Sequence, residues 1–366
     1  MEKTIAFIAE EYGEKNFTSG GIRLNFEIIK YFLTQGYTVD IYAKKFYVIS
    51  DFCRKYYSFS ELKNVDLEKK YLFVLSEKGI YASDVTYIHD HSYNFRNKRI
   101  LSPFLNLLYK IFCRKQHNKR VQKDNIIRKN LKNINTIIVS SNVLKNDYIE
   151  NFDVSEKNIT ILPPPVIDIV TKHIQNKDDD MFVFGLCAIG FERKGGYIAL
   201  KAIKQLKKNY KNFKVKIIYP KMQKNFYLKL LLNLYGIKDY VEFLPSQEDM
   251  NLFYQSINCL IMPSIIEPFG MVATEALTSK IPVIVPSHSG AADVVINGKN
   301  GYVFDFAQNP AKELSKVMTI MLNLPKDTYN QMTENAYLST QNFQAQEFTQ
   351  KYFDIVQKTK NKQLDF

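Results

Sequence analysis

Short apolar runs rich in β-branched residues alternate with longer helical patterns along almost the whole chain. A first series extends from TIAFIA at Thr4 to ITILPP at Ile159, and a second from MFVFGLCA at Met181 to PVIVPS at Pro282. Strands that are apolar throughout and separated by helices are typical of parallel sheets covered by helices on both faces. The alternation therefore predicts an α/β fold.

A polar stretch, KHIQNKDDD from Lys172, separates the two series. At 366 residues the chain is too long for one ordinary domain and long enough for two. We therefore predict two doubly wound, Rossmann-like domains facing a central cleft, with ligands beyond the carboxyl ends of the strands. The expected domains are residues 1–168 and 169–344, followed by a C-terminal helix in 345–366 that could pack back on the first domain.

Composition narrows the class of protein. Apolar residues make up 46% of the chain and charged residues 24%, which is globular composition. No stretch approaches the length of an apolar membrane span, and the first apolar run is too short for a signal peptide. The cysteines have no pairing or metal-type spacing, so we expect reduced thiols in a cytoplasmic protein. They are Cys53, Cys113, Cys187 and Cys259.

Positive charge is concentrated in residues 110–132, within a chain of net charge +13. Such a block favours an anionic partner such as membrane headgroups, a phosphate-bearing polymer or nucleic acid. The stretch before it, LSPFLNLLYKIF from Leu101, has apolar residues at helical spacing, which suggests an amphipathic helix running into a basic one. The alternative is a core-packed helix followed by a solvated face. The residues expected at the anionic surface are Lys110, Arg114, Lys115, Lys119, Arg120 and Lys123.

Two loops of the first half carry candidate site residues. Gly20 and Gly21 precede an amphipathic helix, where backbone amides could approach an anion, although plain turn chemistry would also explain the pair. The run at Val85 ends in His89 and His91, with an aspartate between them. An imidazole there could hydrogen-bond a hydroxyl or a developing charge. Alternatives are structural histidines, or a metal site for which no comparable third ligand lies nearby.

Two loops of the second half suggest an anion site. In FGLCAIGFERKGG, Arg193 and Lys194 stand directly before a glycine pair and a helical run, an arrangement that could hold a diphosphate or leave two solvated cations. In CLIMPSIIEPFGMVATEAL, a helix is expected to begin near Gly270 or Met271, and its free amides could bind phosphate or hydroxyl oxygens. Glu267 precedes this start, and Glu275 lies about one turn inside the helix. They could grip one ligand, or simply favour the helix dipole.

The stretch EPFGMVATEAL…IPVIVPSHSGAADVV closely resembles the signature of retaining glycosyltransferases of the GT-B fold, specifically family 4, the glycosyl transferases group 1. The hallmark of that family is two glutamates separated by seven residues, here Glu267 and Glu275. The likeness covers most of the chain. It includes Gly20-Gly21, HD at His89, TIIVSSNVLKNDYI at Thr136, NITILPPPV at Asn158, RKGG at Arg193 and INGKNGYVFD at Ile296.

The resemblance implies that the second domain binds a nucleotide-sugar donor and the first binds the acceptor. Glu275 would hold the ribose hydroxyls, and Glu267 would reach the hydroxyls of the donor sugar. Arg193 and Lys194 would neutralise the diphosphate, and His89 would lie at the reacting centre. Backbone contacts to the donor would come from Gly20, Gly21, Phe269, Gly270 and Met271.

Two departures from the family pattern fall near these residues. The family usually has Gly-Arg at the end of the first donor-domain strand, whereas GLCAIG has no arginine, and Arg193 is the candidate substitute. Many members have Pro-Asn-Gly-Val where this chain has PPPV near Pro163. By the resemblance, the catalytic set is His89, Glu267 and Lys194, with no metal and no cofactor.

The resemblance implies retaining transfer from a nucleotide sugar, by default a UDP-sugar, to a glycan, cell-envelope polymer or lipid-linked acceptor. The protein would be cytoplasmic, or peripheral at the inner face of the membrane, and nucleic acid is an unlikely partner. Two alternatives stay open. One is a hydrolase that uses both glutamates, which in a retaining enzyme needs carboxyl groups roughly 5 Å apart. The other is a noncatalytic protein that binds anionic membranes or nucleic acid.

Overall fold

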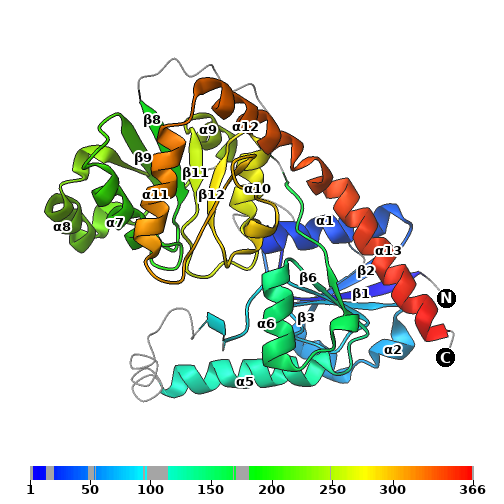
Figure 1. Ribbon diagram of the computed structural model, residues 1–366. Helices are drawn as coiled ribbons and strands as arrows, with labels where there is room; N and C mark the ends of the chain where they lie inside the picture. The colour runs from blue at the N-terminus through cyan, green and yellow to red at the C-terminus, as the bar shows by residue number, and fades with distance from the viewer. Residues whose placement is uncertain are drawn as a thin grey trace. The chain divides into compact units, whose positions relative to one another are not determined.

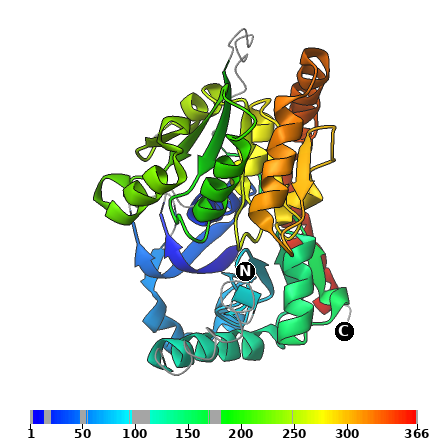
Figure 2. The same cartoon turned by 60° about the vertical axis from the view of Figure 1, so that its left-hand side comes forward.

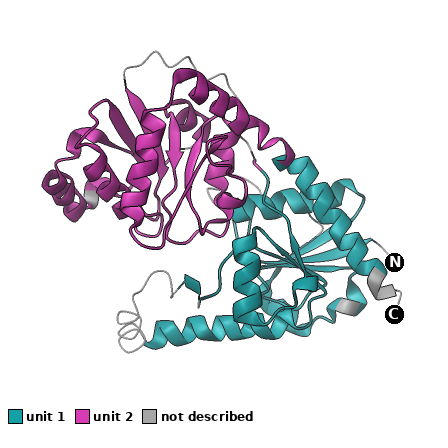
Figure 3. Ribbon diagram, viewed as in Figure 1, with its two compact units in different colours: residues 1–165, 343–366 teal, residues 166–342 magenta. Residues whose placement is uncertain are grey.

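The computed structural model contains two compact units (Figure 3). Unit 1 comprises residues 1–165 and 343–366, and unit 2 comprises residues 166–342. The hypotheses that concern Lys110, Cys113 and the apolar stretch at 101–112 lie outside the described part of the chain. The structure describes residues 3–13, 20–47, 53, 55–93, 95–96, 114–167, 169, 181–247 and 249–364.

Unit 1 is built on a parallel sheet of seven strands, counted over the described residues, in the order β3-β2-β1-β4-β5-β6-β7 (Figure 1). The order reverses between β1 and β4, and the carboxyl ends of strands at such a point are where ligands bind in open α/β sheets. The strands are β1 (Thr4–Tyr12), β2 (Thr38–Phe46), β3 (Lys55–Ser58), β4 (Val74–Glu77), β5 (Val85–Ile88), β6 (Thr136–Val139) and β7 (Ile159–Ile161).

Both faces of the unit 1 sheet are buried. Ile5 and Phe7 of β1 point into a core shared with two helices, whereas Ala6 and Ile8 point into a smaller core on the opposite face. This alternation is expected for a strand covered on both sides. The helical elements are α1 (Gly20–Thr34), η1 (Phe59–Asn64), α2 (Leu67–Lys70), α5 (Arg114–Leu131), α6 (Asn142–Phe152), η2 (Glu156–Asn158) and α13 (Ala345–Leu364).

The C-terminal helix α13 packs in unit 1, although the chain has passed through all of unit 2 before reaching it. Its buried residues Phe348, Tyr352 and Val356 join the core formed by α1 and the sheet. The Tyr352 ring makes an edge-to-face contact with Phe32 of α1, with ring centroids 6.4 Å apart. Unit 1 therefore draws its core from both ends of the described sequence.

Unit 2 contains a parallel sheet in the order β10-β9-β8-β11-β12-β13, as far as its described residues show. This is the order of a dinucleotide-binding Rossmann sheet, and its reversal lies between β8 and β11. Together with the sheet of unit 1 it confirms the predicted pair of doubly wound α/β domains. The strands are β8 (Phe182–Cys187), β9 (Phe213–Ile218), β10 (Val241–Leu244), β11 (Cys259–Ile261), β12 (Val283–Pro286) and β13 (Gly301–Phe304).

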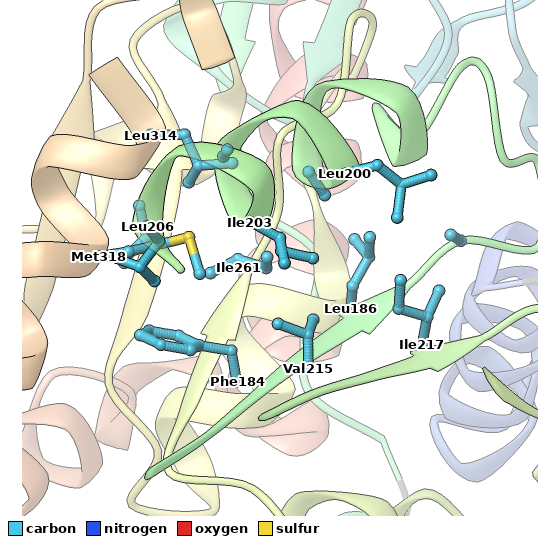
Figure 4. Packing of buried hydrophobic residues seen from close by; sticks show 14 of the residues in the cluster. Phe184, Leu186, Leu200, Ile203, Leu206, Val215, Ile217, Ile261, Leu314 and Met318 are labelled. Carbon is cyan, nitrogen blue, oxygen red and sulfur yellow. The ribbon is translucent and has the colours of Figure 1, made fainter. Parts of the chain in front are cut away.

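Helices cover both faces of the unit 2 sheet (Figures 1 and 2). On one face Phe184 and Val215 pack against Ile203 and Met318 from the helices (Figure 4). That face is covered by α7 (Gly196–Leu206), α8 (Phe226–Tyr235) and α11 (Pro310–Leu322), and the other by α9 (Met250–Gln255), α10 (Met271–Thr278) and α12 (Lys326–Leu338). Short 3-10 turns are η3 (Met222–Lys224), η4 (Lys238–Tyr240), η5 (Gly290–Asp293) and η6 (Gln341–Phe343).

Candidate active site

The loops that follow β8 and β11 meet at the switch point of the unit 2 sheet. Gly195 has φ +73° and caps the N-terminus of α7, and a Cβ added to it would lie 1.8 Å from the Pro263 carbonyl oxygen. Only glycine allows this approach. The Ile265 amide also donates to the Arg193 carbonyl oxygen at 2.9 Å. The two loops are thus held together through their backbones, and each brings candidate side chains to the same edge of the sheet.

Lys194 and Glu267 form a direct ion pair across these loops. Lys194 Nζ donates to Glu267 Oε2 at 2.5 Å, and Ser264 Oγ donates to the same oxygen at 3.3 Å. Burial alone would raise the pKa of Glu267, but the charge and hydrogen bond of Lys194, helped by the charge of Arg193, hold that pKa below its ordinary value. Glu267 is therefore an ionised carboxylate at neutral pH, with its charge balanced by the loop cations.

Arg193 lies in the same loop contact. Its Nη1 donates to the Ile266 carbonyl oxygen at 3.3 Å, and its Nε lies 3.8 Å from the place of a Cβ on Gly190. The guanidinium therefore spans from the segment directly after β8 to the loop that precedes Glu267. The sequence placed Arg193 in the loop after β8. The direction of its side chain could not be predicted, because it depends on packing against the loop after β11.

Glu275 lies inside α10 and has a partner of its own. Tyr254 of α9 donates its hydroxyl to Glu275 Oε2 at 2.7 Å, and both residues are buried. Burial, together with the charge of Glu275, raises the pKa of the nearby Cys187 thiol to about 12, so that thiol is neutral at physiological pH. Tyr254 was not predicted from the sequence, because a tyrosine in an amphipathic helix is usually a core residue.

Helix α10 begins at Met271 with Gly270 as its N-cap, which confirms the predicted start. Gly270 has φ +101°, and an added Cβ would lie 2.8 Å from Met262 Cε. The backbone before the helix is held in place, since the Ala291 amide donates to the Phe269 carbonyl oxygen at 2.6 Å. The amides at the start of α10 therefore have a fixed direction and carry the positive end of the helix dipole.

In unit 1, His89 follows β5 and lies against the start of α1. A Cβ added to Gly21 would lie 2.9 Å from His89 Nε2, so the ring occupies space that only a glycine leaves free. His89 Nδ1 is buried and has no hydrogen-bond partner among the described residues. Burial lowers the pKa of His89 below its ordinary value of 6.5. The imidazole is thus neutral at physiological pH and can donate or accept one hydrogen bond.

The second histidine of YIHDHSY has a different role. His91 Nδ1 donates to Asp147 Oδ2 at 2.8 Å, and Ser92 Oγ donates to the other oxygen of that carboxylate at 2.6 Å. The His91 ring also stacks on Phe95, with ring centroids 3.9 Å apart. His91 therefore ties the loop after β5 to α6. Within the described residues, no three His, Cys, Asp or Glu side chains gather as ligands for a metal ion.

A charged cluster at the end of β1 was not found from the sequence. Glu10 accepts hydrogen bonds from Lys123 at 2.9 Å and from Lys44 and Lys78 at 3.4 Å each. Its backbone amide donates to Glu77 at 2.8 Å. Burial opposes ionisation, but the hydrogen bond and charge of Lys123 and the charges of the other two lysines lower the pKa of Glu10 to about 2. In the sequence, Glu10 directly follows the apolar run TIAFIA, which was the available signal.

The basic block forms helix α5 over its described part. Only Ile127 and Leu131 of this helix are buried, and its lysines and arginines are exposed, which both interpretations of the sequence allow. Lys123 pairs with Glu10. The Arg120 guanidinium lies over the Tyr93 ring at 5.6 Å. None of the helices in the described parts of the chain has the length and apolar character needed to cross a bilayer.

Solved structures share the fold of this chain. WaaG, a glycosyltransferase involved in lipopolysaccharide biosynthesis, superimposes with a TM-score of 0.74 at 17% identity, covering 96% of this chain and 99% of its own. Anabaena Alr3699/HepE, solved with UDP and glucose, gives a TM-score of 0.63 at 14% identity, covering 98% and 100%. The chain therefore has the GT-B architecture of two Rossmann-like domains.

Residues 170–339 match the family model of glycosyl transferases group 1, so this part of the chain is similar to a group 1 glycosyltransferase domain. An uncharacterized glycosyltransferase of Haemophilus influenzae is 26% identical over 167 residues, 45% of this chain and 46% of the relative. The glycosyltransferase MJ1178 of Methanocaldococcus jannaschii is 31% identical over 194 residues, 52% and 51% of the two chains. The chain thus matches about half the length of these relatives.

Proposed function

We propose that this protein is a retaining, metal-independent glycosyltransferase that moves a hexosyl or N-acetylhexosaminyl group from a UDP-sugar to a hydroxyl of its acceptor. The observation that carries the proposal is the arrangement around α10. The amides at its start, Glu267 held by Lys194, and Glu275 held by Tyr254 all belong to the switch-point edge of the unit 2 sheet. Open α/β sheets bind nucleotides at this edge.

In the proposed donor site, the two glutamates bind different parts of one ligand. Glu275 accepts hydrogen bonds from the ribose hydroxyls, and Glu267 accepts them from the donor sugar. Their separate partners in the structure support these separate roles, because each carboxylate is oriented by its own donor. Phe269, Gly270 and Met271 supply backbone contacts to the sugar and phosphates.

The proposed chemistry is stabilisation of a leaving nucleoside diphosphate. Negative charge builds on the diphosphate as the sugar becomes oxocarbenium-like, and cations that are already in place lower the energy of that state by several kcal/mol. Lys194 has three N–H donors and uses one on Glu267, so it can also reach a phosphate oxygen. Arg193, whose side chain passes beside Gly190, takes the place of the arginine that related sequences carry directly after this strand.

We assign the acceptor to unit 1, with His89 at the reacting centre. A neutral imidazole with one free ring nitrogen is suited to a hydrogen bond with a sugar or acceptor hydroxyl. Gly20 and Gly21 bring the start of α1 close to the same place. By the resemblance, the acceptor hydroxyl attacks from the face of the leaving group, which takes up its proton, and no covalent enzyme intermediate forms.

The choice of UDP and of an envelope acceptor draws on relatives. HepE was solved with UDP and glucose, and WaaG is involved in lipopolysaccharide biosynthesis. We extend these properties to the present chain and propose a glycan, cell-envelope polymer or lipid-linked acceptor at the cytoplasmic side of a membrane. Thermal-shift measurements with UDP, GDP and ADP test the base, and the largest stabilisation is expected with UDP.

We further propose that α5 attracts the acceptor or an anionic membrane through its exposed cations. Flotation with anionic vesicles should weaken when Arg114, Lys115, Lys119 and Arg120 are changed to glutamine. Lys123 is left in place in that variant, because it holds Glu10. Flotation that ignores both the lipid charge and the four substitutions would contradict this role of α5.

The site assignment is tested with Lys194→Ala and Glu275→Gln. Glutamine keeps an acceptor for the Tyr254 hydroxyl, so the second variant retains the local packing. We expect each variant to lose about 100-fold or more in kcat/KM for sugar transfer, and Glu275→Gln also to bind UDP more weakly. Lys312→Ala, at an exposed lysine on α11, is the matched control. Unchanged transfer and UDP binding in both site variants would refute the assignment.

Two other functions make different predictions. A retaining glycosidase would need Glu267 and Glu275 to act as a pair, but each has its own hydrogen-bond partner, and simple glycosides should not be hydrolysed. A noncatalytic binder of nucleic acid would bind DNA or RNA at moderate salt and bind no nucleotide sugar. Each outcome is measured directly with the unmodified chain.

A further inference from the structure

Helix α8 exposes an apolar surface that the proposed donor site does not use. Phe226 is 78% exposed, Tyr227 61%, Leu230 54% and Leu234 75%. Figures 1 and 2 both show α8 at the outer edge of unit 2, beside α7. The other exposed large apolar side chains of the described residues are spread singly over separate elements, which is ordinary for a protein surface. Four on one helix of ten residues is a patch.

The four side chains form one continuous stripe. At about 100° per residue, Phe226, Leu230, Leu234 and Tyr227 occupy an arc of about 100° on the helix. The opposite side of α8 is also apolar, because Leu228, Leu231 and Leu232 pack in the core of unit 2. The helix is therefore apolar on its inner and its outer side. Its inner residues account for the packing of unit 2, and the outer stripe adds nothing to that core.

Lysines surround the stripe. Lys201 and Lys204 are exposed on α7, the helix that contacts α8, and Lys208 is exposed just after the end of α7. The Lys204 ammonium lies over the Tyr235 ring of α8 at 4.5 Å, and Lys207 Nζ donates to the Gly236 carbonyl oxygen at 2.8 Å. Residues 195–238 contain eleven lysines and no Asp or Glu: Lys201, Lys204, Lys207, Lys208, Lys211, Lys214, Lys216, Lys221, Lys224, Lys229 and Lys238.

We propose that the α8 stripe docks unit 2 on an anionic lipid bilayer, with the helix lying in the plane of the headgroups. An apolar stripe with lysines beside it is the pattern of helices that lie at a membrane interface, where the apolar side chains enter the boundary of the acyl chains and the cations meet anionic headgroups. Tyr227 suits the same boundary, because its ring is apolar and its hydroxyl is polar.

A second copy of the chain is a poorer occupant. Pairing two α8 stripes would bring two lysine-rich surfaces together, and like charges repel across an interface. A bilayer that contains anionic lipid provides both an apolar phase and the opposite charge. The proposal does not depend on the donor site, so UDP binding serves as an independent measure that each variant is folded.

The first experiment changes the stripe. Phe226→Ser, Leu230→Ser and Leu234→Ser are combined in the full chain, and flotation is measured with vesicles of equal parts phosphatidylcholine and phosphatidylglycerol. We expect vesicle affinity to fall at least tenfold, with UDP binding unchanged. The matched control combines Leu252→Ser, Ile296→Ser and Leu338→Ser, which are similarly exposed and lie elsewhere on unit 2. Equal affinity of the two triple variants would overturn the proposal.

The second experiment uses the absence of tryptophan from the chain. Leu230→Trp provides a single indole on the stripe, and Leu338→Trp provides one on another exposed helix position. With anionic vesicles that contain brominated phospholipid, we expect at least twofold quenching and a blue shift at position 230 only. Quenching equal at both positions, or at neither, would contradict insertion of α8.

The third experiment separates lipid charge from self-association. Lys201→Gln, Lys204→Gln and Lys208→Gln together should lower affinity for the anionic vesicles roughly tenfold or more. Vesicles of phosphatidylcholine alone should bind the unchanged chain at least tenfold more weakly. Sedimentation in the absence of lipid should show no dimer that the serine variant loses. A stripe-dependent dimer, or binding indifferent to lipid charge, would exclude the anionic bilayer as the occupant.

Discussion

Gly21 and His89 show how a single missing side chain shapes the candidate acceptor site. The imidazole lies where a Cβ on Gly21 would stand, 2.9 Å from Nε2. The sequence predicted both residues as site candidates, from a glycine pair at a helix start and a histidine at a strand end. It could not show that they touch, because β1 and β5 are brought near each other only by the sheet order.

Gly21→Ala should therefore separate activity from stability. Alanine favours the middle of a helix by roughly 0.5–1 kcal/mol over glycine, but Gly21 is the second residue of α1 and its Cβ would displace a buried ring, so the melting temperature of the variant should stay close to that of the original chain. The His89 ring must move away from the added methyl group, and because the ring is then misplaced we expect transfer activity to fall at least tenfold. Activity and thermal unfolding are measured on the same preparation. Full activity would mean that the position of His89 does not matter for transfer.

Glu10 gives a prediction for stability against pH. Its folded pKa, about 2, lies below the ordinary value of 4.5, so the folded state gains stability above pH 4.5 and loses it as the pH falls toward 2. Glu10→Gln should destabilise the protein by about 1–2 kcal/mol at pH 7, after allowance for solvent screening of the lysines. The deficit should shrink below pH 4.5 in urea titrations. Glu156→Gln, on an exposed ion pair, should change little.

At the scale of elements, apolar periodicity predicted most strands and the start of α10, but it missed two strands. β3 is half exposed and short, and β13 follows a turn, NGKN, that separates it from any helical pattern. Periodicity also predicted the helix at Ala345, but it did not fix what that helix packs against. An amphipathic pattern shows that a helix has an apolar face, but it does not show which sheet or helix covers that face. Packing with α1 is visible only in three dimensions.

The contribution of α13 can be measured through Phe348. This side chain is 3% exposed in the core of unit 1, so Phe348→Ala should destabilise that unit by about 3–5 kcal/mol, from lost apolar burial and the cavity that remains. Lys351→Ala, on the exposed side of the same helix, should stay within about 0.5 kcal/mol of the original chain. Urea unfolding of the full chain checks both. A small effect of Phe348→Ala would show that α13 adds little to unit 1.

At the scale of the whole molecule, each unit has hydrophobic cores of its own. If UDP binds unit 2, linkage should stabilise that unit by about 2.7 kcal/mol at a UDP concentration 100 times Kd, and its transition temperature should rise. Calorimetry of the Phe348→Ala chain assigns the transitions, because this change lowers the one that belongs to unit 1. If UDP raised only the transition temperature of unit 1, the nucleotide would bind unit 1 and our proposal would be wrong.

The return of α13 to unit 1 sets the order in which the protein can be completed during synthesis. Every strand of unit 2 leaves the ribosome before Phe348, Tyr352 and Val356 do. Unit 1, which is translated first, therefore keeps an exposed apolar face until α13 is made. Unit 2, which is translated second, can fold before then. A nascent chain stalled shortly after η6 would contain a completed unit 2 and an incomplete unit 1, and chaperones should bind the incomplete unit.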